Sequence, residues 1–329
     1  MIQPPNNALV QVKQPENAAV NRTSALANPT VQIKKAHNDI IFRAVVDLDG
    51  NYVAACSGDR HISIWNVYGD CENELMVKSN LAAVLDIAWN VTQDSLITAS
   101  ADKSVAILDT STGEWEQSFF GHKAQVNSVF PLLRTPNQIA SASDDGTAKI
   151  WDTRTDQCIR SLNMTYPLTS VVVLEDGVTL LAGGLDNCIH MWDVRNLVKM
   201  ETLKGHKDSI TSLALSKDSR FVVSNAMDHT LKLWDVKPFS EGDRCIRTFT
   251  GHIHGPEKLM LRCSISDDMQ YILSGSSDNC AHIWSLSSGK HLLKLPGHHG
   301  PVTSAMMHPK EPIVVSSSAD RSIILGELS

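Results

Sequence analysis

The chain of 329 residues carries a formal net charge of −7 at neutral pH, with 42% hydrophobic and 20% charged residues. Its length allows one large or two ordinary domains with a substantial core, while the acidic balance disfavours direct binding of nucleic-acid phosphates. No apolar run approaches the roughly 20 residues that span a bilayer, and the N-terminus lacks the features of a signal peptide, so we expect an intracellular protein.

The first 35 residues divide into two parts. Residues 1–29 are rich in Asn and Pro and poor in aromatic residues, which predicts a disordered N-terminal tail. Residues 30–35 (TVQIKK) begin with alternating polar and apolar side chains and predict a strand. We therefore place the domain boundary at residue 30 and expect deletion of residues 1–28 to leave stability nearly unchanged.

One pattern recurs seven times along residues 30–329: an aspartate followed six residues later by a tryptophan or a residue that replaces it. Successive aspartates are 43, 43, 41, 42, 50 and 42 residues apart, the period of a four-stranded propeller blade. The sequence therefore predicts an all-β, seven-bladed propeller over residues 30–329. The pairs are Asp59/Trp65, Asp102/Leu108, Asp145/Trp151, Asp186/Trp192, Asp228/Trp234, Asp278/Trp284 and Asp320/Gly326.

The fifth repeat shows the four expected strands most clearly, at residues 210–215, 221–224, 231–234 and 244–249. The longest spacing, in the sixth repeat, indicates an insertion at residues 254–258. After Gly326 only three residues remain, too few for a fourth strand of the seventh repeat. We expect the N-terminal strand at residues 30–35 to complete that blade, which closes the ring and removes two exposed sheet edges.

Two further positions recur in register with the aspartate: a histidine 22 to 26 residues before it and a serine or threonine four residues before it. This resembles the His–Ser/Thr–Asp–Trp tetrad of the WD-repeat family, over nearly the whole of residues 30–329. The resemblance implies a buried hydrogen-bond network within each blade, with a structural and not a catalytic role. Complete sets are His122/Ser141/Asp145/Trp151, His206/Ser224/Asp228/Trp234 and His252/Ser274/Asp278/Trp284.

The other four repeats lack at least one tetrad member. Ala55 and Ala182 replace the hydroxyl residue, and Asn80 and Met164 replace the histidine. Because methionine cannot take over the hydrogen bonds of histidine, we expect blade four to be looser inside. No nucleotide loop, dinucleotide fingerprint or metalloprotease motif occurs, so the sequence predicts no catalytic residues, no cofactor and no metal.

Several stretches resemble a narrower group, the WD-repeat subunits of the U5 small nuclear ribonucleoprotein of the spliceosome. They include residues 64–71 (IWNVYGDC), 224–228 (SNAMD), 308–313 (HPKEPI) and the terminal 326–328 (GEL). The resemblance implies a nuclear, non-catalytic scaffold in pre-mRNA splicing that docks the large central scaffold protein of the U5 particle, with its GTPase and helicase nearby. It implies a monomer within a larger complex, indirect or peripheral contact with RNA, and neither a membrane nor a small-molecule substrate.

Two other functional classes remain open. One is a different WD-repeat adaptor, such as a ubiquitin-ligase substrate receptor or a signalling scaffold. Residues 1–29 contain four prolines and no heptad repeat, which argues against the N-terminal coiled coil of a G-protein β subunit. The other is an enzyme on a propeller scaffold, which would need polar groups that converge on the central channel. Arg43 and Asp86 are the candidates for such groups, and they could form an ion pair between blades one and two.

The expected partner surface is the face formed by the loops that connect blades and by the loops between the second and third strand of each blade. Positions three and five after the histidine, and the position before the aspartate, are expected to point outward there. Apolar side chains at these positions indicate a contact patch, to which the insertion at 254–258 would add. They are Ile40, Phe42, Leu85, Leu185 and Met227.

Overall fold

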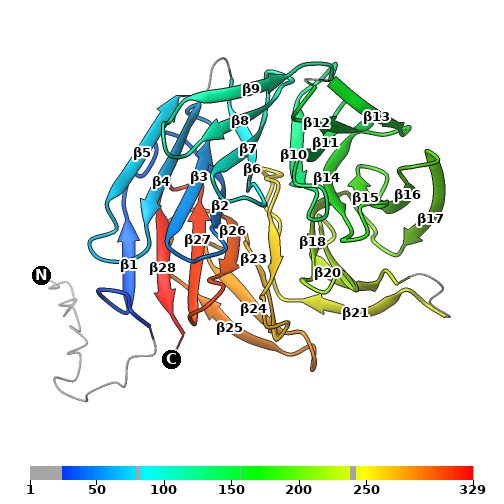
Figure 1. The fold of residues 1–329 in the computed structure, drawn as a ribbon. Helices are drawn as coiled ribbons and strands as arrows, with labels where there is room; N and C mark the ends of the chain where they lie inside the picture. Colours follow the sequence, from blue (N-terminus) through cyan, green and yellow to red (C-terminus); the bar gives the residue numbers. More distant parts are fainter. Residues whose placement is uncertain (1–23, 79–81, 156, 238–241, 329) are drawn as a thin grey trace, which may run out of the picture.

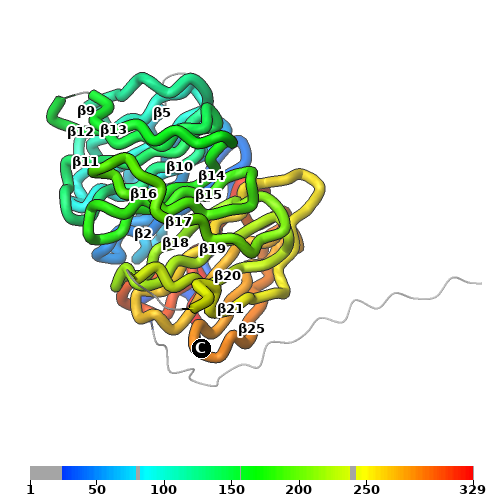
Figure 2. Tube along the Cα trace, turned by 90° about the vertical axis from the view of Figure 1, so that its right-hand side faces the viewer, coloured from blue at the N-terminus to red at the C-terminus, as the bar shows by residue number. Residues whose placement is uncertain are grey.

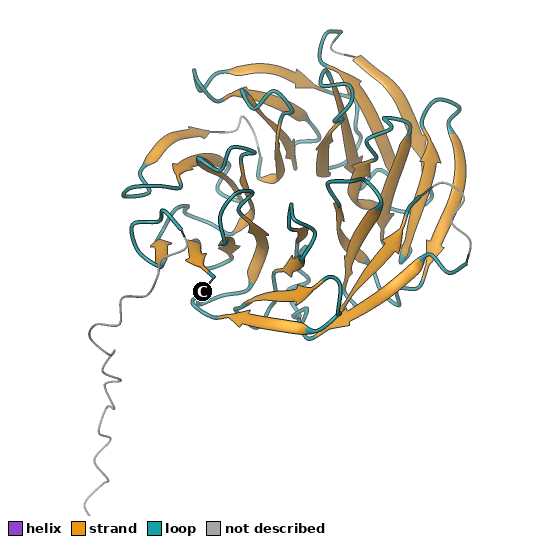
Figure 3. Cartoon of the chain, turned by 60° about the horizontal axis from the view of Figure 1, so that its bottom comes forward, coloured by secondary structure: helices purple, strands orange, loops and turns teal. Residues whose placement is uncertain are grey.

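The computed structural model describes residues 24–78, 82–155, 157–237 and 242–328. These residues form seven four-stranded antiparallel sheets and no helix. Figures 1 and 3 show the sheets arranged like blades around a central axis. The fold is thus the predicted seven-bladed β-propeller. Within each blade we call the strands a to d, from the innermost to the outermost.

The first six blades are each built from four consecutive strands. Blade one consists of β2 (Ile41–Val46), β3 (Tyr52–Ser57), β4 (His61–Asn66) and β5 (Asn73–Lys78). Blade two consists of β6 (Val84–Trp89), β7 (Ser95–Ser100), β8 (Val105–Asp109) and β9 (Trp115–Phe119). Blade three consists of β10 (Val126–Pro131), β11 (Gln138–Ser143), β12 (Thr147–Asp152) and β13 (Gln157–Asn163). Blade four consists of β14 (Leu168–Val173), β15 (Thr179–Gly184), β16 (Cys188–Asp193) and β17 (Val198–Lys204). Blade five consists of β18 (Ile210–Leu215), β19 (Phe221–Ala226), β20 (Thr230–Asp235) and β21 (Cys245–Thr250). Blade six consists of β22 (Cys263–Ile265), β23 (Tyr271–Ser274), β24 (Ala281–Ser285) and β25 (His291–Leu295).

Blade seven joins the two ends of the chain. Its strands a to c are β26 (Val302–Met307), β27 (Ile313–Ser318) and β28 (Ile323–Glu327), and its strand d is β1 (Thr30–Ile33). β1 pairs antiparallel with β28, so that Thr30 lies opposite Gly326 and Ile33 opposite Ile323. The N-terminal strand closes the ring as predicted, although it ends at Ile33. Lys35 already has the positive φ of 55° that turns the chain toward blade one.

The packed part of the chain begins before the expected boundary at residue 30. Leu26 is only 2% exposed and lies in the core cluster shared by blades seven and one. The backbone amide of Ser24 donates to Glu327 Oε1 at 3.0 Å, and that of Ala25 donates to Glu311 Oε2 at 2.8 Å. Residues 24–29 are therefore part of the propeller and not of a tail. The prediction of disorder for residues 1–23 falls outside the described residues.

The hydrophobic core lies between neighbouring blades, because each sheet has two faces that must be covered. One cluster, for example, joins Val45 and Ile64 of blade one to Ile87 and Leu96 of blade two. The innermost strands are also linked by serine hydroxyls that accept a backbone N–H of the next blade. These bonds are Ala44 to Ser304 at 3.0 Å, Leu213 to Ser170 at 3.0 Å and Cys263 to Ser212 at 3.3 Å.

Candidate docking surfaces

The predicted tetrads of blades three and five form as hydrogen-bond networks. His122 bonds through Nδ1 to Asp145 Oδ2 at 3.0 Å and through Nε2 to Ser141 Oγ at 2.8 Å, and Trp151 Nε1 donates to the same Ser141 oxygen at 2.8 Å. In blade five His206 bonds through Nδ1 to Asp228 Oδ2 at 3.1 Å and through Nε2 to Ser224 Oγ at 2.6 Å. Trp234 Nε1 donates to the same Ser224 oxygen at 2.8 Å. With both ring nitrogens engaged and the hydroxyl bonded twice, these groups hold the blade together and have no free atom for chemistry.

The tetrad predicted for blade six does not form, so that prediction is wrong. His252 Nε2 bonds instead to Oδ1 of Asn225, a fully buried side chain of blade five, at 2.9 Å. Trp284 Nε1 donates to the carbonyl oxygen of Thr250 at 2.9 Å. Ser274 Oγ accepts from Asn225 Nδ2 at 3.2 Å, while Asp278 pairs with His282 at 3.0 Å. Asn225 thus takes the place that the tetrad serine has at the histidine Nε2 of other blades, and no aspartate in the described part of the chain bonds to Nδ1 of His252.

A second histidine, His254, also reaches Asn225 Oδ1, at 3.2 Å. His252 and His254 are both buried, and their Nδ1 atoms have no hydrogen-bond partner among the described residues. Burial, and then the neighbouring histidines, lower the pKa of His252 to about 3 and that of His254 to about 4. Both rings are therefore neutral at physiological pH. The described residues include no group of three or more His, Cys, Asp or Glu side chains able to hold a metal ion.

Two blades replace a missing tetrad member from strand c. In blade one Ser63 lies opposite Ala55 in the sheet, and its hydroxyl bonds to His37 Nε2 and to Trp65 Nε1, each at 2.8 Å. In blade four, which has Met164 at the histidine position, His190 Nε2 bonds to Asp186 at 2.6 Å. The Trp192 indole N–H of blade four is buried without a partner in the described structure. Asn80 of blade two lies outside the described residues.

The ring centre holds a charged cluster, part of which the sequence indicated. Arg43 Nη1 lies 2.6 Å from Asp86 Oδ1, as the proposed ion pair between blades one and two requires. Arg262, which precedes β22 in blade six, lies 3.8 Å from Asp86 Oδ2 and donates to the carbonyl oxygen of Asn127 in blade three at 2.6 Å. Arg262 lies 16 residues before Asp278, as Arg43 lies 16 before Asp59 and Asp86 lies 16 before Asp102. Register counted from the histidine missed it, because the insertion at residues 254–258 lies between His252 and Arg262.

The electrostatics of this cluster follow from burial and charge. The Asp86 side chain is fully buried, and desolvation alone would raise its pKa; the charges of Arg262 and Arg43 outweigh this effect, so that the pKa is lowered. Asp86 Oδ2 also accepts the backbone N–H of Val129 at 3.1 Å. The polar groups at the ring centre therefore satisfy one another, an arrangement that suits a structural role better than catalysis.

The expectation that the fifth position after the histidine points to solvent is wrong. The side chains at this position in blades three, four, five and seven are at most 5% exposed. Each donates to a main-chain carbonyl of the following blade: Asn127 to Leu168 at 2.8 Å, Thr169 to Ile210 at 2.6 Å, Thr211 to Leu261 at 3.0 Å and Thr303 to Ile41 at 2.6 Å. Phe42 and Leu85 occupy this register in blades one and two. Both are partly buried, and Phe42 packs against the core between these blades.

The remaining predicted contact residues lie on the loops at one end of the blades. We call this end the d–a face; it comprises the connections between blades and the turns between strands b and c. Leu185 is 44% exposed there, whereas Ile40 and Met227 are partly buried. Three more exposed apolar side chains lie on this face and were not predicted from the sequence. They are Phe120 (73%), Tyr166 (53%) and Ile253 (50%).

Tyr166 and Leu185 belong to adjoining loops of blade four. The backbone N–H of Leu185 donates to the carbonyl oxygen of Pro167, the residue after Tyr166, at 3.1 Å. We refer to Tyr166 and Leu185 as the blade-four patch. Its loop is the one in which Met164 replaces the tetrad histidine, a departure from the repeat that could have drawn attention to this position. In Figure 2 the insertion that follows β21, coloured gold, projects from the ring, with Pro256, Glu257 and Lys258 exposed.

Comparisons with known proteins agree with this architecture. The model of the family described as WD domain, G-beta repeat matches residues 29–66, 113–152, 156–193, 197–235, 243–285 and 289–325. The unmatched interval contains strands β6 to β8 of blade two, whose repeat has Asn80 and Leu108 at the histidine and tryptophan positions. The described part of the chain has no helix long and apolar enough to span a membrane.

Curated relatives match almost the full chain. Pre-mRNA-splicing factor cwf17 of Schizosaccharomyces pombe is 38% identical over 314 residues, which cover 95% of this chain and 92% of that protein. The U5 small nuclear ribonucleoprotein 40 kDa protein of Homo sapiens is 38% identical over 307 residues, 93% of this chain and 86% of its own length. The Dictyostelium discoideum protein of the same name is 37% identical with the same two coverages. The chain therefore belongs to the WD-repeat family, in the group that contains the U5 small nuclear ribonucleoprotein 40 kDa proteins and cwf17.

Proposed function

We propose that the chain is a nuclear, non-catalytic scaffold subunit of the U5 small nuclear ribonucleoprotein. In this role it docks the large central scaffold protein of that particle, near its GTPase and helicase, during pre-mRNA splicing. Support comes from the identity of the relatives, a pre-mRNA-splicing factor and U5 proteins, which match over at least 93% of this chain. A rigid ring of blades that exposes loops at both ends is an architecture for binding other macromolecules.

The observation that best supports a docking role is the blade-four patch. Its aromatic and aliphatic side chains are 53% and 44% exposed on adjoining loops, and exposed apolar side chains that lie together mark interaction sites. The repeat that carries the patch also leaves its own network incomplete at Trp192. A departure from the repeat pattern that brings no gain in stability is typical of a functional position.

The proposal is tested with a tagged chain in which Tyr166 and Leu185 are both changed to Asp. Because both side chains are largely outside the core, we expect a normal melting temperature but loss of U5 proteins and U5 RNA from the affinity-purified complex, measured by quantitative mass spectrometry and RNA blotting. The matched control is Leu293→Asp, a side chain of β25 with 43% exposure, which should retain them.

The result can contradict the proposal in two ways. Full retention of U5 components by the double variant would show that another surface is used. Recovery of ubiquitin-ligase or signalling subunits in place of splicing proteins by the unmodified chain would contradict the splicing role itself.

A further inference from the structure

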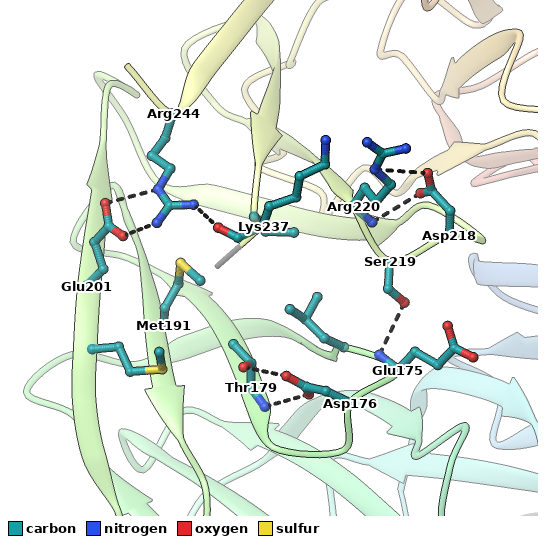
Figure 4. Close-up of a pocket in the computed structure, with 13 residues that line it drawn as sticks. Glu175, Asp176, Thr179, Met191, Glu201, Asp218, Ser219, Arg220, Lys237 and Arg244 are labelled. Atoms are coloured by element: carbon teal, nitrogen blue, oxygen red, sulfur yellow. Dashed lines mark hydrogen bonds and ion pairs between the residues drawn. The ribbon is translucent and has the colours of Figure 1, made fainter. Parts of the chain in front are cut away.

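A groove lies on the face opposite the d–a face, between blades four and five. Its volume is about 540 Å³. Leu174, Met191 and Val236 are buried side chains that line it, and Met200 borders it with 57% of its surface exposed. The side walls are the turn between strands a and b of blade four, the same turn of blade five, and Lys237 and Arg244 beside strands c and d of blade five (Figure 4).

The groove is held open by contacts that cross between the two blades. The backbone N–H of Glu175 donates to Ser219 Oγ at 3.1 Å, which ties the two a–b turns together. On the other side Arg244 spans the blades and forms two bonds with the carboxylate of Glu201, at 2.8 and 3.3 Å. Figure 4 shows these two contacts at opposite walls. A cleft braced in this way does not have to form when a ligand binds, which lowers the entropic cost of binding.

The charges along the groove are unevenly satisfied. Glu201 is neutralised by Arg244, and Asp218 lies 3.9 Å from Arg220. Asp176 accepts bonds from its own turn, from the N–H groups of Val178 and Thr179 and from the Thr179 hydroxyl. Among the described residues the Glu175 carboxylate has no such partner. The blade-four wall is therefore the anionic side, beside an apolar floor with two flexible methionines that adapt to different side chains.

A second hollow continues from the same wall toward blade three. It is lined by Leu133, Arg134, Glu175 and Asp176 and has a volume of about 330 Å³. Glu175 and Asp176 thus form a ridge between two adjoining hollows. A surface extended over three blades suits a linear segment of chain better than a compact small molecule.

From these features we propose that the groove binds a linear peptide segment of a partner protein, in which an apolar residue is adjacent to a lysine or arginine. The apolar side chain lies against Met191, Met200 and Val236, and the basic side chain pairs with Glu175. Because the groove is opposite the blade-four patch, the ring can hold this partner and a partner on the d–a face together. The inference does not depend on the proposed splicing role.

The experiment selects ligands directly. A phage library of random linear 12-residue peptides is panned on the full chain, and the enriched peptides are synthesised with a fluorescent label. Their dissociation constants are measured by fluorescence anisotropy for the unmodified chain and for Glu175→Lys and Met200→Asp. Glu175 and Met200 are both exposed, so the variants should fold normally, which melting curves verify. We expect enriched peptides that carry an apolar–basic pair and at least tenfold weaker binding by each variant.

Matched controls make the same chemical changes elsewhere. Glu116→Lys on β9 repeats the charge reversal, and Met76→Asp on β5, where Met76 is 49% exposed, repeats the apolar-to-acidic change. Both should bind the selected peptides as the unmodified chain does, and so should the Tyr166/Leu185 double variant. The inference is overturned if no peptide is enriched, if the enriched peptides lack the pair, if both groove variants bind normally, or if free arginine at millimolar concentration displaces the peptides completely.

Discussion

The carboxylate of Asp86 stabilises the ring centre through its contacts with two arginine side chains. Its side chain is fully buried beside Arg43 and Arg262, and the loss of one member of such a group leaves an uncompensated charge in a poorly solvated place. We expect Asp86→Asn to lower the free energy of unfolding by about 3 to 5 kcal/mol. Arg43→Met should cost less, since Asp86 keeps Arg262 and the Val129 N–H.

A double-mutant cycle in urea tests this ion pair. The coupling between Arg43→Met and Asp86→Asn should lie within about 0.5 to 3 kcal/mol, the range for residues in direct contact. Lys217 and Asp267 serve as the control, because they join blades five and six at 2.7 Å but are 69% and 39% exposed. Their coupling should stay between about 0 and 1 kcal/mol. Equal coupling for the two pairs would show that enclosure at the ring centre adds nothing.

At the scale of elements, the N-terminal segment contributes more than the strand that closes the ring. A chain that begins at residue 24 should unfold like the full chain. A chain that begins at residue 29 loses Leu26, whose burial contributes about 1.5 to 3 kcal/mol. A chain that begins at residue 34 also loses β1, which exposes the edge of β28 and should promote aggregation.

Melting temperatures and light scattering of the three truncations measure these effects. Leu26→Ala in the full chain is the matched variant for the second truncation, and we expect a comparable loss of stability. If the chains that begin at residues 24 and 29 melt alike, Leu26 does not contribute to closure, and the original boundary at residue 30 would stand.

For the whole molecule, the buried histidines predict acid sensitivity. Burial is the largest of the causes that lower the pKa of these histidines. They are His37, His122, His252, His254, His282 and His298. In the unfolded chain these groups bind protons from about pH 6.5 downward, whereas the folded chain resists protonation. Since the unfolded state then binds more protons, stability must fall as the pH decreases below about 6.5.

The tetrad aspartates add a second loss at lower pH. Hydrogen bonds from the networks lower the pKa of Asp145 to about 2 despite its burial, so stability present above about pH 4 is lost as the pH falls toward 2. We expect the urea midpoint to decrease between pH 7 and 5 and again below pH 4. A His252→Gln/His254→Gln variant should show a smaller decrease between pH 7 and 5, and an unchanged slope would contradict the assignment to these histidines.

The extent to which the sequence predicted this molecule follows from what a repeat can encode. Blade number, strand order and ring closure were predictable, because each depends on local alternation and on one period that recurs along the chain. The networks of blades three and five were predictable for the same reason: their members come from a single repeat.

Contacts between repeats, in contrast, depend on the tertiary structure. Asn225 of blade five captures His252 of blade six, Arg262 crosses the ring to Asn127, and Phe42 lies in the seam between blades. Register within one repeat assigned His252 to a tetrad and Phe42 to solvent, and it gave Arg262 no role. Asn225 and His252 are 27 residues apart and meet where the neighbouring blades five and six pack together. Arg262 and Asn127 are 135 residues apart and meet because the ring brings the inner strands of blades six and three around one centre.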